Sequence, residues 1–355
     1  MTTDSILLDD TPESIPVTPT GGPIEVDLLI VGAGPVGLFA TYYAGVRGLR
    51  TAVVDSLPEP GGQVSAMYPE KPIYDIAGFT SVTGRQLVTN LVEQAAQYDP
   101  TYLLGDQVVT CEPLEGGSGF EVVTDSGAVI RTGAVVIAGG IGTFTPRALP
   151  AGEAHLGRGL DYFVPRLTDY EGQDVVVVGG GDSACDWALA LAPIAASVTL
   201  VHRRTAFRAH KATVEKVLAG NVEVITDAQV TAVIGEERVE SVILSTPDGP
   251  VTRRADRVIA ALGFQANLGP LRDWGLDLVD NRHIVVDSTM ATSLPGVYAA
   301  GDITDYPGKV RLIAVGFGEA ATAVNNAAVF VRPGSEVFPG HSTDQDPASA
   351  KVSVA

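Results

Sequence analysis

One pattern occurs twice in this sequence: a short buried strand, a glycine-rich turn, a helix and a second buried strand. The first copy is VDLLIVGAGPVGLFATYYAGVRGLRTAVVDS, and the second is DVVVVGGGDSACDWALALAPIAASVTLVHRR. In both copies 23 residues separate the first motif glycine from the end of the second strand, from Gly32 to Asp55 and from Gly179 to His202. A strand, a glycine turn and a helix leading to a parallel strand form a βαβ dinucleotide-binding unit. The sequence therefore predicts two such units in equivalent registers.

Length and composition agree with two compact domains. The chain has 355 residues, of which 45% are hydrophobic and 18% charged, and a typical domain has ~150 residues. The predicted fold class is α/β, with two Rossmann-like dinucleotide-binding domains of three layers (ββα). Alternating apolar and polar residues predict a small antiparallel sheet over 101–137 in the first domain. The β-rich stretch 222–262 is its counterpart in the second domain.

The predicted elements divide the chain into four parts. Residues 1–25 are expected to be a disordered acidic tail, 26–148 and 264–335 a discontinuous first domain, 149–263 the second domain, and 336–355 a C-terminal tail. Residues 1–25 contain no Lys or Arg and no long apolar run, so we expect neither a signal peptide nor a transit peptide, and a cytoplasmic protein.

Charge and cysteine content argue against several functions. Lys and Arg number 23 against 42 Asp and Glu, a net charge of −19 that repels nucleic acid and anionic membranes. The two cysteines, Cys111 and Cys185, form no CxxC motif, and the five histidines lack metal-ligand spacing. We therefore expect no dithiol centre and no metal site, and Cys185 is predicted to be a packed helix residue. No apolar run reaches the ~18 residues of a membrane-spanning helix.

The first glycine motif, GAGPVG, is predicted to bind a pyrophosphate. Gly32 permits the tight turn, Gly34 lets the backbone approach the phosphates, and Gly37 lets the helix pack on the strand. Pro35 lies in the same motif. Asp55 ends the second strand, where a carboxylate holds the adenosine ribose.

The second motif, GGGDSA, differs from the first in the residues at the end of its second strand. Its predicted cofactor residues are Gly179, Gly181, Asp182, Ser183 and Ala184, with alanine in the place of the third glycine. No acid ends that strand; the residues there are His202, Arg203 and Arg204, with Arg208 four residues on. Guanidinium groups suit a ribose 2′-phosphate, which an Asp would repel, so the motif predicts NADP(H) rather than NAD.

A third motif, AAGD, identifies the first nucleotide. Asp302 follows the apolar run GVYAA and precedes a helix. A carboxylate at that strand end can accept a hydrogen bond from a flavin ribityl hydroxyl. Because this motif follows two nucleotide-binding units in the chain, it predicts that the nucleotide bound at the first site is FAD.

Together these motifs resemble the two-domain flavoproteins of the thioredoxin reductase family. The chain departs from that family in the stretch GLDYFVPRLTDYEGQ, where those enzymes have a redox CxxC and this chain has no cysteine. The segments DSLPEPGGQVSAMYPEKPIYDIAG, YPGKVRLIAVGFGEAATAVNNA and PGHST resemble the ferredoxin–NADP+ reductases of the thioredoxin-reductase type found in bacteria. The resemblance covers about residues 26–343.

This second resemblance implies roles for individual residues. The FAD contacts that it implies are Asp55, Gly62, Gln63, Tyr68, Val108, Phe144 and Asp302. Tyr68 is expected to stack on one face of the flavin ring. His341 is expected to cover the other face, with Ser342 and Thr343 close to the flavin edge.

The resemblance also implies an activity. It is hydride exchange between NADPH and FAD N5, followed by two one-electron transfers to or from ferredoxin, in a homodimer. Because ferredoxins are acidic, Lys71, Lys309 and Arg311 are candidates for a positive docking patch. Hydride transfer is expected to need movement of the tail, or rotation of the second domain at 142–150 and 260–263. The alternatives are a reductase of flavodoxin or a quinone, and a non-catalytic flavin-binding sensor.

Overall fold

The structure, a computed structural model, describes residues 22–116 and 118–341. The predicted tail over 1–25 is therefore described only from residue 22, and the C-terminal tail only as far as His341. Ser342 and Thr343 lie outside the described residues.

The first half of the fold is built on a seven-stranded sheet in the order β5-β2-β1-β8-β7-β6, with β21 also paired to β8. The strands are β1 (Ile24–Val31), β2 (Thr51–Asp55), β5 (Thr101–Leu104), β6 (Val108–Pro113), β7 (Phe120–Thr124), β8 (Val129–Ile137) and β21 (Val297–Ala299). β5, β2, β1, β8 and β21 are parallel, and β6 and β7 are antiparallel additions. The chain thus returns to its first sheet at β21, after residue 296.

The predicted separate sheet over 101–137 is wrong in two respects. β5 is not part of it but a parallel strand beside β2. β8 pairs with three strands: along one edge its first residues pair with β7 and its last residues with β21, and along the other edge it pairs with β1. The alternating pattern indicated strands correctly, but it does not specify which neighbour each half of a long strand takes.

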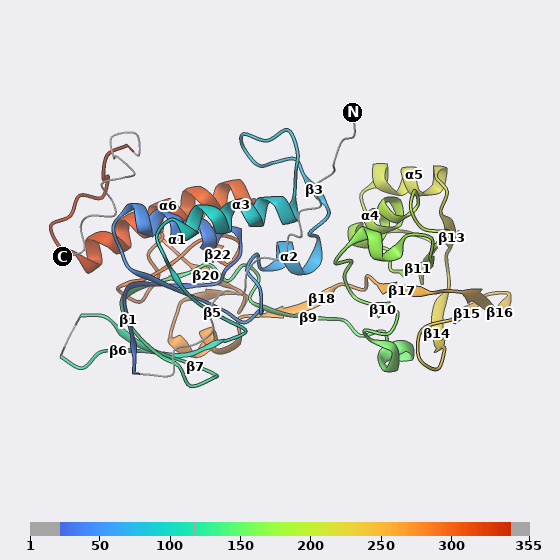
Figure 1. Cartoon of the computed structure of the whole chain (residues 1–355), viewed down its shortest axis with the longest axis horizontal. Coiled ribbons are helices and arrows are strands. Elements are labelled where there is room, and N and C mark those ends of the chain that lie inside the picture. Colours follow the sequence, from blue (N-terminus) through green and yellow to red (C-terminus); the bar gives the residue numbers. More distant parts are fainter. Residues whose placement is uncertain (1–21, 117, 342–355) are drawn as a thin grey trace, which may run out of the picture.

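Three helices pack together against this sheet: α1 (Pro35–Val46), α3 (Gly84–Ala96) and α6 (Ile313–Val331) (Figure 1). Smaller elements complete this half of the chain: α2 (Gln63–Met67), β3 (Pro72–Ile73), β4 (Val82–Thr83), β19 (Leu278–Val279), β20 (His283–Val285), β22 (Thr304–Asp305) and a 3-10 helix at Gly269–Trp274. The core between sheet and helices is made of apolar strand residues such as Leu28, Leu29 and Ile30, which are fully buried.

The second half has three layers. Its central sheet is parallel throughout, in the order β10 (Leu160–Asp161), β17 (Arg257–Ala260), β11 (Asp174–Val178), β12 (Ser197–Val201), β13 (Glu223–Ile225). Helices α4 (Asp182–Leu191) and α5 (Lys211–Ala219) belong to one core, and the antiparallel sheet β14 (Gln229–Ile234), β15 (Ser241–Thr246), β16 (Gly249–Arg254) to another. Two 3-10 helices cover Pro150–His155 and Leu167–Tyr170. This is the predicted ββα arrangement.

Two strands connect the halves: β9 (Thr143–Pro146) and β18 (Phe264–Asn267), which pair antiparallel and run between them in Figure 1. Beside the ladder, Arg147 N donates to Gly263 O at 2.9 Å. Gly142 and Gly263 adopt φ values of +81° and +82°, which favour glycine. β9 lies within the predicted hinge 142–150, and β18 begins directly after the predicted hinge 260–263; rotation at these segments stays a prediction. The exact domain boundaries stay a prediction.

Candidate functional site

The first glycine turn follows β1 and opens α1. Gly32 has φ +110°, and a Cβ there would lie 2.5 Å from the carbonyl oxygen of Ala138. A Cβ on Gly37 would lie only 1.8 Å from the carbonyl oxygen of Gly32, so strand and helix meet at van der Waals contact. A Cβ on Gly34, the N-cap, would meet nothing within 4 Å. The first and third glycines therefore serve packing, and the second faces open space in front of the helix N-terminus.

Asp55 lies at the carboxyl end of β2, next to this turn. Its Oδ2 accepts a hydrogen bond from Ala33 N at 2.6 Å, and its Oδ1 accepts one from Leu57 N at 2.8 Å. Burial raises the pKa of the carboxyl group, and the two backbone hydrogen bonds act in the opposite direction. Each oxygen keeps a lone pair, so the carboxylate can still accept a hydroxyl group.

A large pocket begins at this turn. Its empty space, including solvent at the mouth, is about 1160 Å³. It lies where β1, β2, β8 and β21 end, the carboxyl edge at which α/β sheets bind ligands. The predicted residues that line it are Gly32, Gly34, Pro35, Asp55, Gly62, Gln63, Tyr68, Val108, Phe144 and Asp302. Gly37 is not among the lining residues.

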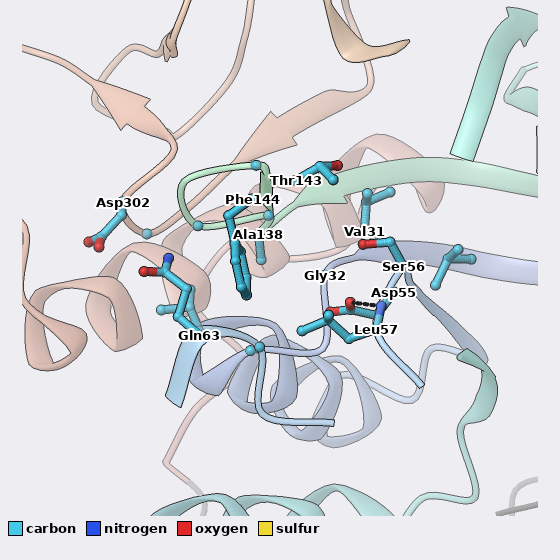
Figure 2. A pocket seen from close by; sticks show the side chains of 18 of the residues that line it. Val31, Gly32, Asp55, Ser56, Leu57, Gln63, Ala138, Thr143, Phe144 and Asp302 are labelled. Carbon is cyan, nitrogen blue, oxygen red and sulfur yellow. Dashed lines mark hydrogen bonds between the residues drawn. The ribbon is translucent and has the colours of Figure 1, made fainter. Parts of the chain in front are cut away.

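The pocket has two different ends. Figure 2 shows Gln63 and Asp302 together at one end and Asp55, Ser56 and Leu57 at the other. Burial raises the pKa of Asp302, opposed by the positive charges of Lys309 and Arg311. The residues present fit a long ligand with an apolar ring system at one end and hydroxyl groups along its length.

Tyr68 lies where the two halves of the chain meet. It follows the last residue of α2 and lines the pocket. Its ring packs against two hydrophobic cores, one between α4 and the sheet of the second half and one beside α3. Burial raises the pKa of its phenol, and the carboxylates of Asp302 and Asp75 add to the shift. Its hydroxyl group therefore stays protonated at neutral pH. Stacking on a flavin stays a prediction.

The second glycine turn has the same design. Gly179, with φ +156°, would place a Cβ 2.4 Å from the carbonyl oxygen of Ala261, whereas a Cβ on Gly181 would meet nothing within 4 Å. Gly181 caps α4, as Gly34 caps α1, and both have extended backbones. Asp182 and Ser183 are exposed at the start of α4, and Ala184 is buried. The open N-terminus of α4 suits an anion.

The residues after β12 divide into buried and exposed groups. His202 is 7% exposed, stacks on Phe207 with centroids 4.9 Å apart, and has Nε2 3.1 Å from the carbonyl oxygen of Ala206. Its ring also fills the space where a side chain on Gly180 would lie.

Arg203, Arg204 and Arg208 are all exposed, and among the described residues no carboxylate forms a salt bridge with them. Arg208 N donates to Gly180 O at 2.8 Å, which ties this loop to the glycine turn. The structure thus offers three uncompensated guanidinium groups on a loop fastened to the second turn.

The described part of the C-terminal segment, which ends at His341, is fastened at the end of α1 that lies away from the first glycine turn. The Arg47 guanidinium, at the far end of α1, donates to the carbonyl oxygens of Glu336 and Val337. The twelve residues of α1 separate that end from the glycine turn by about 18 Å, and the four residues from Val337 to His341 span at most about 14 Å. The His341 ring packs edge-on against Phe338, with centroids 5.2 Å apart. Its predicted place over a flavin stays a prediction.

Sequence reasoning missed part of the pocket and misplaced one cation. Leu268, Pro270 and Leu271, which come more than 120 residues after Phe144 in the sequence, form a wall that no local motif indicates. Lys309 was predicted to be a surface docking residue, but its side chain is only 3% exposed and pairs with Glu319. That prediction is wrong, because packing of α6 against the loop removes Lys309 from solvent. Lys71 and Arg311 are half-exposed.

Several contacts join the two halves near the pocket. The Lys71 ammonium pairs with Asp186 of α4, and the Arg85 guanidinium donates to Pro165 O at 2.9 Å. Phe144 packs edge-on against Phe163, with centroids 6.3 Å apart. These contacts fix the position of the first glycine turn relative to the second in this structure.

The comparisons with known proteins agree with this geometry. Residues 26–327 match the family model described as pyridine nucleotide-disulphide oxidoreductase. The chain belongs to this family. A relative from Nocardioides sp. (strain ATCC BAA-499 / JS614) named ferredoxin–NADP reductase is 61% identical over 329 residues, 92% of this chain and 99% of the relative. One of the same name from Thermus thermophilus is 48% identical, covering 90% of this chain and 97% of the relative. The sequence-based resemblance to ferredoxin–NADP reductases is confirmed.

Solved structures support the fold of this pyridine nucleotide-disulphide oxidoreductase. T. acidophilum thioredoxin reductase superimposes with a TM-score of 0.69 at 29% identity, covering 86% of this chain and 98% of that one. The thioredoxin-reductase-like α/β fold with two Rossmann-like sheets is therefore confirmed.

This family member has no disulphide of its own. Its two cysteines are both free: Cys111 lies in β6 of the first half of the chain and Cys185 in α4 of the second. Cys185 is fully buried in α4, as predicted, and burial raises the pKa of its thiol to about 11. A thiol that is buried and protonated is a poor nucleophile.

Potential metal ligands do not cluster in the described part of the chain. In residues 22–116 and 118–341, no group of His, Cys, Asp and Glu is arranged to hold a metal ion. Over the same residues, no helix combines the length and apolarity needed to cross a bilayer.

Proposed function

We propose that this protein is a ferredoxin–NADP reductase that binds FAD in the pocket beside Asp55 and NADP(H) at the second glycine turn. The observation that carries the proposal is the pair of glycine turns on one chain, each open in front of a helix N-terminus. An acid follows the first turn and three unpaired arginines follow the second. Relatives named ferredoxin–NADP reductase, similar over nearly their whole length, support the same assignment.

The first site is assigned to FAD because its groups fit the parts of that molecule. The open backbone at Gly34 faces the pyrophosphate, Asp55 accepts the ribose hydroxyls, and Asp302 accepts a ribityl hydroxyl. Gln63, Tyr68 and Phe144 surround the ring end, and Val108 lies along the wall. When bound, FAD supplies the chemistry that joins a two-electron hydride donor to a one-electron carrier.

The second site is assigned to NADP(H). The N-terminus of α4 and the glycine backbone hold the pyrophosphate, while Arg203, Arg204 and Arg208 hold the 2′-phosphate. The His202 ring packs against the glycine turn at Gly180, where it fills the space that a side chain would need.

The protein's remaining task is to bring the two sites together. Hydride transfer requires reacting atoms ~3–3.5 Å apart, and β9 and β18 with their flanking glycines are the elements about which the halves would rotate. The Lys71–Asp186 pair would break or reform in that rotation. Removing the chain from Pro339 onward and measuring flavin reduction by stopped flow tests the separate hypothesis that the tail gates access. Unchanged rates would count against it.

Ferredoxin is the proposed electron acceptor or donor. Because the chain and ferredoxins are both acidic, docking requires a local positive area, for which Lys71 and Arg311 remain the candidates. Reversing both charges should lower ferredoxin-dependent turnover and spare ferricyanide reduction; equal losses in the two assays would reject this surface.

The deciding experiment compares initial rates with NADPH and NADH, using ferredoxin and thioredoxin as acceptors. We expect NADPH and ferredoxin to be preferred, and thioredoxin to be inactive because the chain lacks a CxxC. Turnover with flavodoxin or a quinone but not ferredoxin would favour another reductase. Bound flavin without NADPH oxidation would favour a sensor.

We also propose a homodimer, which the resemblance to bacterial ferredoxin–NADP+ reductases implies. A cytoplasmic location is proposed because NADPH and ferredoxin are soluble. Sedimentation equilibrium of the purified protein tests the first, and cell fractionation the second. A monomer at micromolar concentration would reject the dimer.

A further inference from the structure

A buried ion pair lies directly behind the turn that carries Asp302. Lys309 lies in the loop between β22 and α6, and Glu319 in the second turn of α6; their side chains are 3% and 5% exposed. Among ion pairs of the described residues, no other has both side chains below one tenth exposed. Burying two charges is costly unless their hydrogen bonds are satisfied.

The pair satisfies its hydrogen bonds through Gly301, the residue before Asp302. Glu319 Oε2 accepts from Gly301 N at 2.7 Å, and Lys309 Nζ donates to Gly301 O at 2.9 Å. Glu319 Oε1 accepts from Lys309 and from the Tyr306 hydroxyl. Thr304 Oγ1 also donates to Gly301 O, at 2.8 Å. Both backbone polar groups of Gly301 are thus held by this cluster.

The backbone at Gly301 needs such support. Its φ is +84°, and a Cβ would meet the Val36 side chain at 3.2 Å. Gly316 of α6 lies against it, since a Cβ there would be 3.4 Å from the Gly301 Cα. Because this turn is fastened at both groups and packed between α1 and α6, the side chain that follows it has few alternative directions. That side chain is Asp302, which lines the pocket at the same end as Gln63 (Figure 2).

The cluster also acts on the charge of Asp302. Charged and titratable side chains that influence Asp302 are Tyr68, His283, Lys309, Arg311 and Glu319. After desolvation, which raises the pKa of Asp302, Lys309 has the largest effect and lowers it, while Glu319 raises it. The two members of the pair therefore have opposite effects on the same carboxyl group.

We propose that Lys309, Glu319 and Tyr306 form a positioning cluster that fixes the Gly301–Asp302 turn, and the charge on Asp302, for binding of FAD. This rests on the proposed assignment of the first pocket to FAD. The cluster touches neither the cofactor site's open space nor the second glycine turn, so it acts through Gly301 and Asp302 alone.

The experiment measures the FAD dissociation constant of the apoprotein by flavin fluorescence between about pH 4 and pH 8. Lys309→Met and Glu319→Gln should each weaken binding by about tenfold or more at neutral pH, because each leaves a buried charge unpaired. They should differ in pH dependence. Without Lys309, the lower pH limit of FAD binding should move upward, and without Glu319 it should move downward. A role confined to stability would not produce opposite shifts.

Two further variants make the result decisive. Tyr306→Phe removes only one hydroxyl donated to Glu319, and should fold and weaken FAD binding by about three- to tenfold. Arg257→Met breaks a partly buried pair with Asp161 in the second half of the chain and should leave FAD binding unchanged. Wild-type protein that binds no FAD would overturn the proposed function together with this inference. If the wild type binds FAD but the Lys309, Glu319 and Tyr306 variants bind it with unchanged affinity, the inference alone is overturned. The same holds if the pH limits of the Lys309 and Glu319 variants shift in the same direction.

Discussion

Replacing Arg203 and Arg204 by glutamine should convert the second site from one that prefers NADPH to one that no longer distinguishes NADPH from NADH. Both guanidinium groups are exposed, and no described carboxylate pairs with either. Their positive charge is therefore free to meet the dianionic 2′-phosphate of NADPH. NADH has a hydroxyl group there, so it gains little from these residues.

The size of the effect follows from their exposure. Hydrogen bonds to charged groups contribute about 1.5–3 kcal/mol each. Because solvent screens exposed charges, each arginine here belongs at the lower end, about 1.5 kcal/mol, which corresponds to about tenfold in affinity. Removing two should raise the KM for NADPH about 100-fold, while the KM for NADH stays unchanged. Raising the ionic strength should weaken NADPH binding in the wild type and much less in the variant.

The assay is steady-state reduction of ferricyanide with NADPH or NADH as donor, which does not depend on ferredoxin docking. Arg238→Gln is the matched control, since Arg238 is an exposed arginine in the same half of the chain, in the turn after β14. Its KM values should equal those of the wild type. A rise of less than about threefold for NADPH in the double variant, or an equal rise for NADH, would refute the 2′-phosphate assignment.

Other predictions concern the first site. Gly34→Ala should leave the free energy of unfolding of the apoprotein nearly unchanged, because its Cβ meets nothing within 4 Å, but should release FAD on gel filtration. Gly37→Ala places a Cβ 1.8 Å from a backbone oxygen and should cost about 3 kcal/mol or more in urea unfolding; equal stability of the two variants would contradict the packing argument. Burial raises the pKa of Asp302 above its ordinary 3.8, so its stabilising contribution is present below that value and lost as the pH rises through the folded pKa. Apoprotein with Asp302→Asn should therefore be more stable than wild type at pH 7, with the difference vanishing near about pH 4, and should bind FAD more weakly. A difference independent of pH would contradict this.

Local sequence was enough to predict both glycine turns. Each depends on a few neighbouring residues: apolar strand residues, glycines at fixed spacing and a helix directly after them. The requirements are short-range, and the structure shows them as steric facts at Gly32, Gly37 and Gly179. The acid at Asp55 and the arginines after β12 could be predicted for the same reason, since strand ends in a parallel sheet lie at one edge.

Long-range packing decided what the motifs could not. The sequence could not indicate that β8 changes neighbours along its length, because strand patterns specify faces and not partners. The burial of Lys309 depends on where α6 lies relative to a loop, and the pocket wall at Leu268 and Leu271 depends on a return of the chain.

By itself, the sequence predicted two dinucleotide-binding units and the nucleotide proposed for each, and it contains no CxxC motif. Those properties reside in side-chain chemistry at fixed local spacing. Only the tertiary structure decided which charged residues are surface groups and which support the pocket from behind. It also showed that Glu336 and Val337 are hydrogen-bonded to Arg47, at the end of α1 away from the first glycine turn. The physical reason is that burial and charge pairing are set by contacts between distant segments, and one sequence does not display those contacts.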